Sequence, residues 1–96
     1  MIPNEIIVVK DRQSVIFQYE NDSNLVLSAY YLRLKSPSAK NKNLREKIIP
    51  SSIKVLEIQE IGNYAIRISF SDNHSTGIYS WEYIFKIGKE NSASTP

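Results

Sequence analysis

Short runs of alternating apolar and polar residues constrain this sequence most strongly, because an alternation with a period of two is typical of half-buried β-strands. The clearest run covers residues 64–70, YAIRISF, in which Tyr64, Ile66, Ile68 and Phe70 would face one way. Other runs that favour short strands lie at residues 5–10, 14–19, 25–27, 53–60 and 75–79. The sequence therefore predicts a mainly antiparallel arrangement of short strands.

Turn-forming residues separate these runs. Asp11-Arg12 divides the first two runs, and Gly62-Asn63 precedes the run at 64–70. Gly and Asn tolerate the positive φ that tight hairpins require, so we expect a hairpin at Gly62-Asn63, and a second short turn at Asp11-Arg12. The residues expected to share one face of the second run are Val15, Phe17 and Tyr19.

Two short helices are predicted from serine caps. Ser28 precedes the run AYYLRL at residues 29–34, and Ser80 precedes a second helix that we expect Gly88 to end. The spacing i, i+3, i+4 places three apolar side chains of the second helix on one face. The residues expected to build the core of this half of the chain are Tyr64, Ile66, Ile68, Phe70, Trp81 and Phe85.

These elements predict an α+β fold in which a twisted, mainly antiparallel sheet and two short helices form a single two-layer domain. We expect the domain to cover residues 1–88, because residues 89–96, KENSASTP, are almost entirely polar and predict a disordered tail. Residues 36–52 are polar, basic and bracketed by Pro37 and Pro50, which predicts a long exposed loop.

Composition excludes several classes of site. The chain has no cysteine, so it cannot form a disulfide, a thiolate zinc site or a cysteine-ligated iron–sulfur cluster. It has no apolar run long enough to span a membrane and no N-terminal pattern typical of a signal peptide, so we expect a cytoplasmic location. Residues 33–54 hold seven lysines and arginines and one glutamate, whereas the rest of the chain is mildly acidic.

Three segments carry a resemblance to a known family. They are LRLKSPSA at residues 32–39, GNYAIRI at 62–68 and DNHSTGIYSWEYI at 72–84, and the likeness extends over most of residues 5–87. Together they resemble the gamma-butyrobetaine hydroxylase N-terminal-like domain family, which in bacteria includes small stand-alone proteins of unknown function. The resemblance implies a compact α+β fold with a twisted antiparallel sheet and short helices.

The resemblance also implies an accessory role. In eukaryotic hydroxylases this domain precedes an iron- and 2-oxoglutarate-dependent catalytic domain, and related copies are fused to P-loop carriers of iron–sulfur clusters. The eukaryotic domain binds a structural zinc through cysteines and one histidine. His74 matches that histidine, but no cysteine is present, so the metal is not expected here. The resemblance does not extend to the catalytic domain, so the hydroxylase activity is not expected either.

His74 is the only histidine in the sequence, so it is the candidate for a metal ligand. Asp72 and Ser75 lie close to it in sequence, yet neither a second histidine for an iron site nor a nucleophile elbow for hydrolysis accompanies them. We therefore expect residues 71–74 to form a turn and His74 to bond to the backbone or to cap the following segment. No catalytic residue, metal site or cofactor site is predicted.

The surface offers better candidates for recognition. The basic segment would attract an acidic protein, whereas nucleic acid is not expected because no aromatic residue lies between Leu32 and Ile53. Tyrosine and arginine are enriched where proteins contact each other. Arg33 has two interpretations, a buried ion pair or a recognition contact. The predicted partner-binding residues are Tyr30, Arg33, Lys40, Lys42, Arg45, Lys47 and Tyr79.

The sequence thus predicts a non-enzymatic accessory domain that contacts a protein partner and no membrane. By analogy with the fused relatives, the pathway expected is iron–sulfur cluster assembly or an iron- and 2-oxoglutarate-dependent oxygenase. Two alternatives stay open at this stage. One is a metal- or small-molecule-binding protein that uses His74, and the other is an RNA-associated protein that uses the basic loop.

Overall fold

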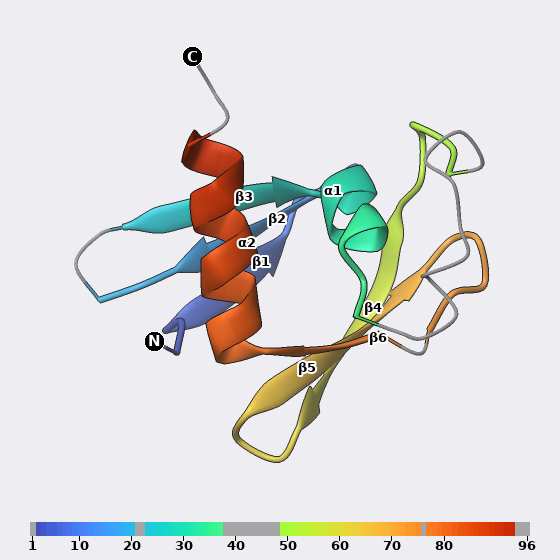
Figure 1. Cartoon of the computed structure of the whole chain (residues 1–96). Helices are drawn as coiled ribbons and strands as arrows, with labels where there is room; N and C mark the ends of the chain where they lie inside the picture. The colour runs from blue at the N-terminus through green and yellow to red at the C-terminus, as the bar shows by residue number, and fades with distance from the viewer. Residues whose placement is uncertain (1, 21–22, 38–48, 76, 94–96) are drawn as a thin grey trace.

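The fold consists of two small antiparallel sheets and two helices (Figure 1). The computed structural model describes residues 2–20, 23–37, 49–75 and 77–93 of the chain. The elements in chain order are β1 (Glu5–Val8), β2 (Ser14–Gln18), β3 (Asn24–Ser28), α1 (Ala29–Leu34), β4 (Val55–Ile61), β5 (Ala65–Phe70), β6 (Gly77–Ser80) and α2 (Trp81–Ala93). The predicted α+β class is confirmed, with the antiparallel strands divided between the sheets β1-β2-β3 and β4-β5-β6.

The first sheet is a meander joined by tight turns. Strands β1 and β2 pair with Ile7 opposite Ile16, and Arg12 in the turn between them has a φ of 62°. The predicted turn at Asp11-Arg12 is therefore confirmed. The alternation in β2 is confirmed as well, because three side chains of this run are buried together. They are Val15, Phe17 and Tyr19.

The second sheet contains the hairpin predicted at Gly62-Asn63, where Gly62 has a φ of 56°. Ile66, Ile68 and Phe70 are buried, as the alternation predicts. The prediction that Tyr64 shares their buried face is wrong, because its side chain is 59% exposed. Tyr64 precedes β5 and lies in the turn, where its amide bonds to Ile61, so the alternation of the strand does not reach it.

Helix α2 starts where the sequence predicts and ends later. The Ser80 hydroxyl accepts a hydrogen bond from the Tyr83 amide, as expected of a cap. The predicted end at Gly88 is wrong, because the helix continues to Ala93. The polar composition of residues 89–96 predicts a disordered tail, but residues 89–93 are helical. Residues 94–96 lie outside the described residues.

Gly88 has a packing role instead. A Cβ atom at this position would lie 2.6 Å from Cδ1 of Leu25 on β3. The missing side chain therefore lets α2 approach the first sheet closely, and Figure 1 shows the helix crossing that sheet. Ile84 and Ile87 are fully buried on the inner side of the helix, whereas Phe85 is half-buried and meets the Tyr19 ring edge-on.

One core joins both sheets and both helices. Its largest buried side chains include Phe17 and Leu27 from the first sheet, Phe70 and Tyr79 from the second, and Leu32 from α1. The predicted burial of Trp81 is confirmed. The predicted exposed loop at residues 36–52 begins and ends differently, because Ser36 and Ile49 are both buried, and residues 38–48 lie outside the described part. No described helix is long and apolar enough to cross a membrane.

The close approach at Gly88 is testable by a double-mutant cycle. Gly-to-Ala changes within helices usually stabilise by about 1 kcal/mol. Here we expect Gly88→Ala to destabilise by about 1–2 kcal/mol, because the new methyl group overlaps Leu25. In the background Leu25→Ala the same change should become neutral or stabilising, as measured by urea unfolding. A stabilising Gly88→Ala in the native background would contradict this packing.

Candidate functional site

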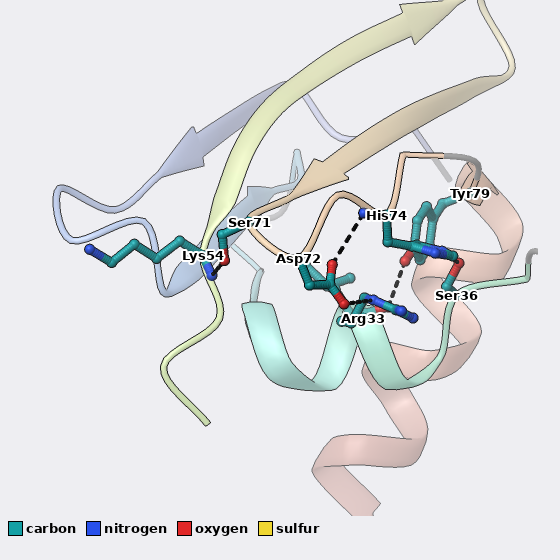
Figure 2. A network of polar contacts seen from close by, with 8 residues as sticks. Arg33, Ser36, Lys54, Ser71, Asp72, His74 and Tyr79 are labelled. Atoms are coloured by element: carbon teal, nitrogen blue, oxygen red, sulfur yellow. Dashed lines mark hydrogen bonds and ion pairs between the residues drawn. The ribbon is translucent and has the colours of Figure 1, made fainter. Parts of the chain in front are cut away.

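The residues that the sequence singled out as polar candidates meet in one buried cluster at the end of α1 (Figure 2). Arg33 on α1 donates from Nε to Oδ2 of Asp72 at 2.8 Å, and only 4% of Arg33 is exposed. The other Asp72 oxygen accepts from the His74 amide at 3.2 Å. Asp72 therefore fastens its own turn, in which Asn73 has a φ of 67°, and ties that turn to α1.

The predicted turn at residues 71–74 is thus confirmed, and a second set of bonds anchors it. Ser71 accepts at Oγ from the Lys54 amide and donates its own amide to the Lys54 carbonyl, both at 2.9 Å. The Phe70 amide closes the turn on the His74 carbonyl at 2.8 Å. These bonds join the segment before β4 to the connection between β5 and β6.

His74 lies inside this cluster. Its side chain is buried, its Nε2 lies 2.9 Å from the Ser36 hydroxyl, and its ring packs beside Phe70. A Cβ at Gly77 would lie 2.3 Å from that same hydroxyl, so only glycine leaves room for Ser36 to reach the imidazole in its present position. The imidazole therefore connects the end of α1 to the approach to β6.

Tyr79 is part of the core. It is fully buried, and its hydroxyl donates to the Leu32 carbonyl at 2.5 Å. Burial, the largest effect, raises the pKa of Tyr79 far above its ordinary value. The prediction that Tyr79 contacts a partner at the surface is therefore wrong. Its short strand turns the ring inward, where the hydroxyl satisfies a carbonyl of α1.

The other predicted contact residues divide into three groups. Arg33 is buried, which supports the ion-pair interpretation over a surface contact. Tyr30 is half-buried on α1. The remaining predicted residues lie outside the described part of the chain, and they are Lys40, Lys42, Arg45 and Lys47.

The zinc site of the cysteine-containing branch does not fit these residues. The chain has one histidine and no cysteine, and Nε2 of that histidine, His74, lies against Ser36. Among the residues that the structure describes, no three His, Cys, Asp or Glu side chains gather into a possible metal site. No step that needs a metal follows from this arrangement.

A groove that sequence reasoning missed lies between strands β1 and β4, the outer strands of the two sheets. Its volume is about 500 Å³. The residues that border it are Glu5, Ile6 and Val8 of β1 and Leu56, Glu57, Ile58 and Glu60 of β4, and we call it the β1–β4 groove.

Arg12 fixes one end of this groove. From the β1–β2 turn its guanidinium donates to the carbonyls of Val55 and Leu56 at 3.2 and 3.0 Å. Its own carbonyl accepts from the Val55 amide at 2.8 Å. These bonds join the two sheets at the start of β4, and beyond them β1 and β4 border an open space.

Exposed apolar side chains surround the groove. Ile2 is 62% exposed and Leu56 is 53% exposed, and both line the groove together with Trp81. Ile2 and Trp81 also line an adjoining hollow of about 320 Å³, which includes Tyr64. The Trp81 indole donates to the Asn63 carbonyl at 3.0 Å, which holds the wall between the two hollows in place.

One signal in the sequence pointed to Leu56. Within KVLEI, Val55 and Leu56 are adjacent apolar residues, and neighbouring residues of a strand face opposite sides. Burial of Val55 therefore requires Leu56 to face away from the core, unless a second layer covers it. Nothing in the sequence indicates that β1 lies across the groove from Leu56, because the proximity of β1 and β4 depends on tertiary packing.

The comparisons with known proteins agree with the fold. A family model described as gamma-butyrobetaine hydroxylase-like, N-terminal, matches residues 6–85. The chain belongs to this family. The resemblance seen in the sequence is thereby confirmed, and the family assignment carries no established activity for its small stand-alone members. No curated protein matches the chain with significance.

Solved structures of similar proteins share the architecture. A crystal structure of a protein of unknown function from the DUF971 family of Acidithiobacillus ferrooxidans has 28% identity and a TM-score of 0.74, covering 90% of this chain and 91% of that one. A protein solved by NMR has 25% identity and a TM-score of 0.74, with 96% and 76% covered. A second NMR structure, at 22% identity and a TM-score of 0.72 with 94% and 70% covered, supports the fold alone.

The Arg33–Asp72 pair predicts a large stability effect. Asp72→Ala removes the carboxylate from a buried guanidinium, so we expect a loss of about 2–3 kcal/mol in urea unfolding. The exposed Glu57→Ala should change stability by less than about 0.5 kcal/mol. Replacing both partners, as in Arg33→Met with Asp72→Ala, should recover part of the loss. Equal effects of Asp72→Ala and Glu57→Ala would contradict the role of the pair.

The buried tyrosine predicts alkaline instability. Because the folded-state pKa of Tyr79 is raised, the folded protein keeps a proton that the unfolded chain releases above about pH 10. The Tyr79 contribution to stability is therefore complete below that pH and is lost as the pH rises further. Urea unfolding between about pH 8 and 11 should show this fall, and Tyr79→Phe should reduce its slope. An unchanged slope in Tyr79→Phe would argue against the assignment.

Proposed function

We propose that this domain is a non-enzymatic interaction module that contacts a protein partner through the β1–β4 groove. The observation that carries the proposal is the grouping of apolar surface. Among the described residues five large apolar side chains are exposed, and three of them line the groove or the adjoining hollow. These are Ile2, Leu56 and Tyr64. Contiguous exposed apolar surface marks interaction sites in soluble domains.

The polar cluster at Arg33, Asp72 and His74 supports a structural role over a catalytic one. The contacts seen for these side chains run to one another and to neighbouring elements, as the ion pair and the Ser36 contact show. A catalytic carboxylate or imidazole needs a reacting group within hydrogen-bond reach. These side chains are instead engaged in joining α1 to the turn between β5 and β6, so we assign them to stability.

The family context directs the search for the partner. The family model matches residues 6–85, and the family resemblance implies relatives that adjoin iron–sulfur carriers or oxygenases. By that analogy we propose that the partner belongs to iron–sulfur cluster assembly or is an iron- and 2-oxoglutarate-dependent oxygenase. With no cysteine in the chain, its part there would be protein contact and not cluster ligation. We place this function in the cytoplasm, since a chain without cysteine suits a reducing compartment.

The proposal is tested by changing one exposed leucine. Leu56→Asn removes an apolar side chain from the wall of the groove without adding charge, and Val26→Asn makes a matched change on β3, because the two side chains are 53% and 56% exposed. Tagged wild-type protein and both variants are used to recover partners from extracts of the source cell, and the recovered partner is then purified and its affinity measured. We expect Leu56→Asn to weaken binding by about tenfold or more and Val26→Asn to leave it unchanged.

Two results would count against the proposal. One is equal loss of binding in both variants, which would indicate a general effect of replacing an exposed apolar side chain with a polar one. The other is a partner whose affinity depends on Lys40, Lys42 and Lys47 and not on Leu56, which would move the contact to the basic segment. Far-UV circular dichroism and urea unfolding of each variant establish that the fold is intact.

A further inference from the structure

We propose that the occupant of the β1–β4 groove is an extended, basic segment of the partner protein, which adds as a strand to the free edge of β4. This inference rests on the proposed function and names the chemistry of the partner. Two independent properties of the groove support it. One is the geometry of the strand edges, and the other is the sign of the charges along them.

The groove follows strand edges. In the part of the chain that the structure describes, β4 pairs with β5 alone, and β1 pairs with β2 alone. Beyond the register shift between Val55 and Glu57, successive residues of β4 face opposite sides, yet the consecutive residues Glu57 and Ile58 both border the groove. A space that meets both faces of a strand lies along its edge, where backbone amides and carbonyls are presented.

Arg12 occupies only the first part of that edge. Its guanidinium and carbonyl engage Val55 and Leu56, and the pairing with β5 shifts register between Val55 and Glu57. From Glu57 to Glu60 the strand continues regularly beside β5. This length offers the ladder that an added strand needs, and such additions derive affinity from main-chain bonds and specificity from side-chain contacts.

The charges select a basic occupant. Glu5 on β1 and Glu57 and Glu60 on β4 are exposed and border the groove from both sides. The cation that borders it, Arg12, already donates to two carbonyls. Arg67 on β5 lies opposite Gln59 and donates to its side-chain oxygen at 2.6 Å. It is not among the residues that border the groove. The groove is therefore net acidic, and a segment rich in lysine or arginine complements it.

The pleat defines the pattern of that segment. Ile58 and Glu60 share one face of β4, and Glu57 lies on the opposite face. Carboxylates therefore lie on both faces of β4, so basic residues of an added strand would meet Glu57 on one face or Glu60 on the other, and its apolar residues would contact Ile58. Acidic residues also keep free edges from aggregating, so the experiment has to separate that passive role from recognition.

The test uses a synthetic peptide that alternates lysine and valine and matches β4 in length, 7 residues. A fluorescent label reports its binding to the full chain by anisotropy at low and physiological salt. Three further peptides serve as comparisons: one alternates glutamate and valine, one has the lysine sequence with alternate amides N-methylated, and one is lysine-rich with the order scrambled. N-methylation keeps the charge and removes the donors of a β-ladder, so it separates strand addition from charge attraction.

Matched charge reversals locate the binding. Glu57→Lys with Glu60→Lys changes the groove, and Glu20→Lys with Glu90→Lys makes the same change in net charge at exposed positions elsewhere. We expect the groove pair to weaken the lysine–valine peptide by about tenfold or more and the control pair by no more than about threefold. In the wild-type chain, hydrogen exchange of the amides of Glu57–Glu60 should slow when the peptide is bound.

Several outcomes would overturn the inference. Equal binding of the N-methylated or scrambled peptide would show charge attraction without a strand, and equal binding of the glutamate peptide would remove the charge argument. Equal weakening by both reversed pairs would place the site elsewhere. A groove pair that changes the sedimentation of the protein alone, without changing peptide binding, would assign the groove to a second copy of this chain.

The two proposals fail separately. If Leu56→Asn abolishes binding of the purified partner while the lysine–valine peptide does not bind, the groove is an interaction site and the strand-addition inference is wrong. If Leu56→Asn leaves partner binding unchanged, the proposed function itself is wrong. The exchange measurement uses wild-type protein, so it decides the inference even where a charge-reversed variant does not fold.

Discussion

The bonds of Arg12 to the start of β4 determine how the two sheets of this domain meet. The turn residue adopts a positive φ, its carbonyl accepts from Val55, and its guanidinium reaches the carbonyls of Val55 and Leu56. These backbone-directed bonds join the two sheets at the start of β4. Along the rest of their length β1 and β4 are outer strands, and the space between them is the β1–β4 groove.

Polar groups are paired within the domain at the end of α1, whereas those beside β4 face an open groove. At the end of α1 the buried groups Arg33, Asp72 and His74 meet partners within the domain, which makes that region a rigid support. Beside β4 the backbone edge and three carboxylates face an open groove with exposed apolar side chains around it. Because the polar groups at the end of α1 are hydrogen-bonded within the domain, that cluster has a structural role. The open edge of β4 favours recognition of a partner at the β1–β4 groove.

Local patterns were sufficient to predict most of the secondary structure. Alternation located β2 and β5, and the serines at 28 and 80 located the starts of both helices, where each hydroxyl accepts from an amide of the first turn. Gly88 misled the prediction because its role depends on Leu25, which is far away in sequence. Tyr64 misled it because the hairpin turn ends the alternation before that residue.

The candidate site was harder to predict because it depends on long-range packing. The segment GIYSW suggests that Tyr79 is a surface aromatic residue. In the structure Tyr79 is buried in the core, and its hydroxyl donates a hydrogen bond to the Leu32 carbonyl. The pairing of Arg33 with Asp72 spans 39 positions, and the meeting of β1 with β4 spans a greater distance. Charge composition drew attention to the basic segment, while the acidic groove is assembled from residues scattered over two strands.

We propose that the domain recognises its partner at the β1–β4 groove and not at the basic segment. Photo-crosslinking from single positions in living cells distinguishes these two surfaces, with a photoreactive residue placed in turn at Ile2, Leu56, Tyr64, Val26, Lys42 and Lys47. We expect crosslinks to one partner from Ile2, Leu56 and Tyr64 and none from Val26, Lys42 or Lys47. Crosslinks from Lys42 or Lys47 with none from the groove would contradict it.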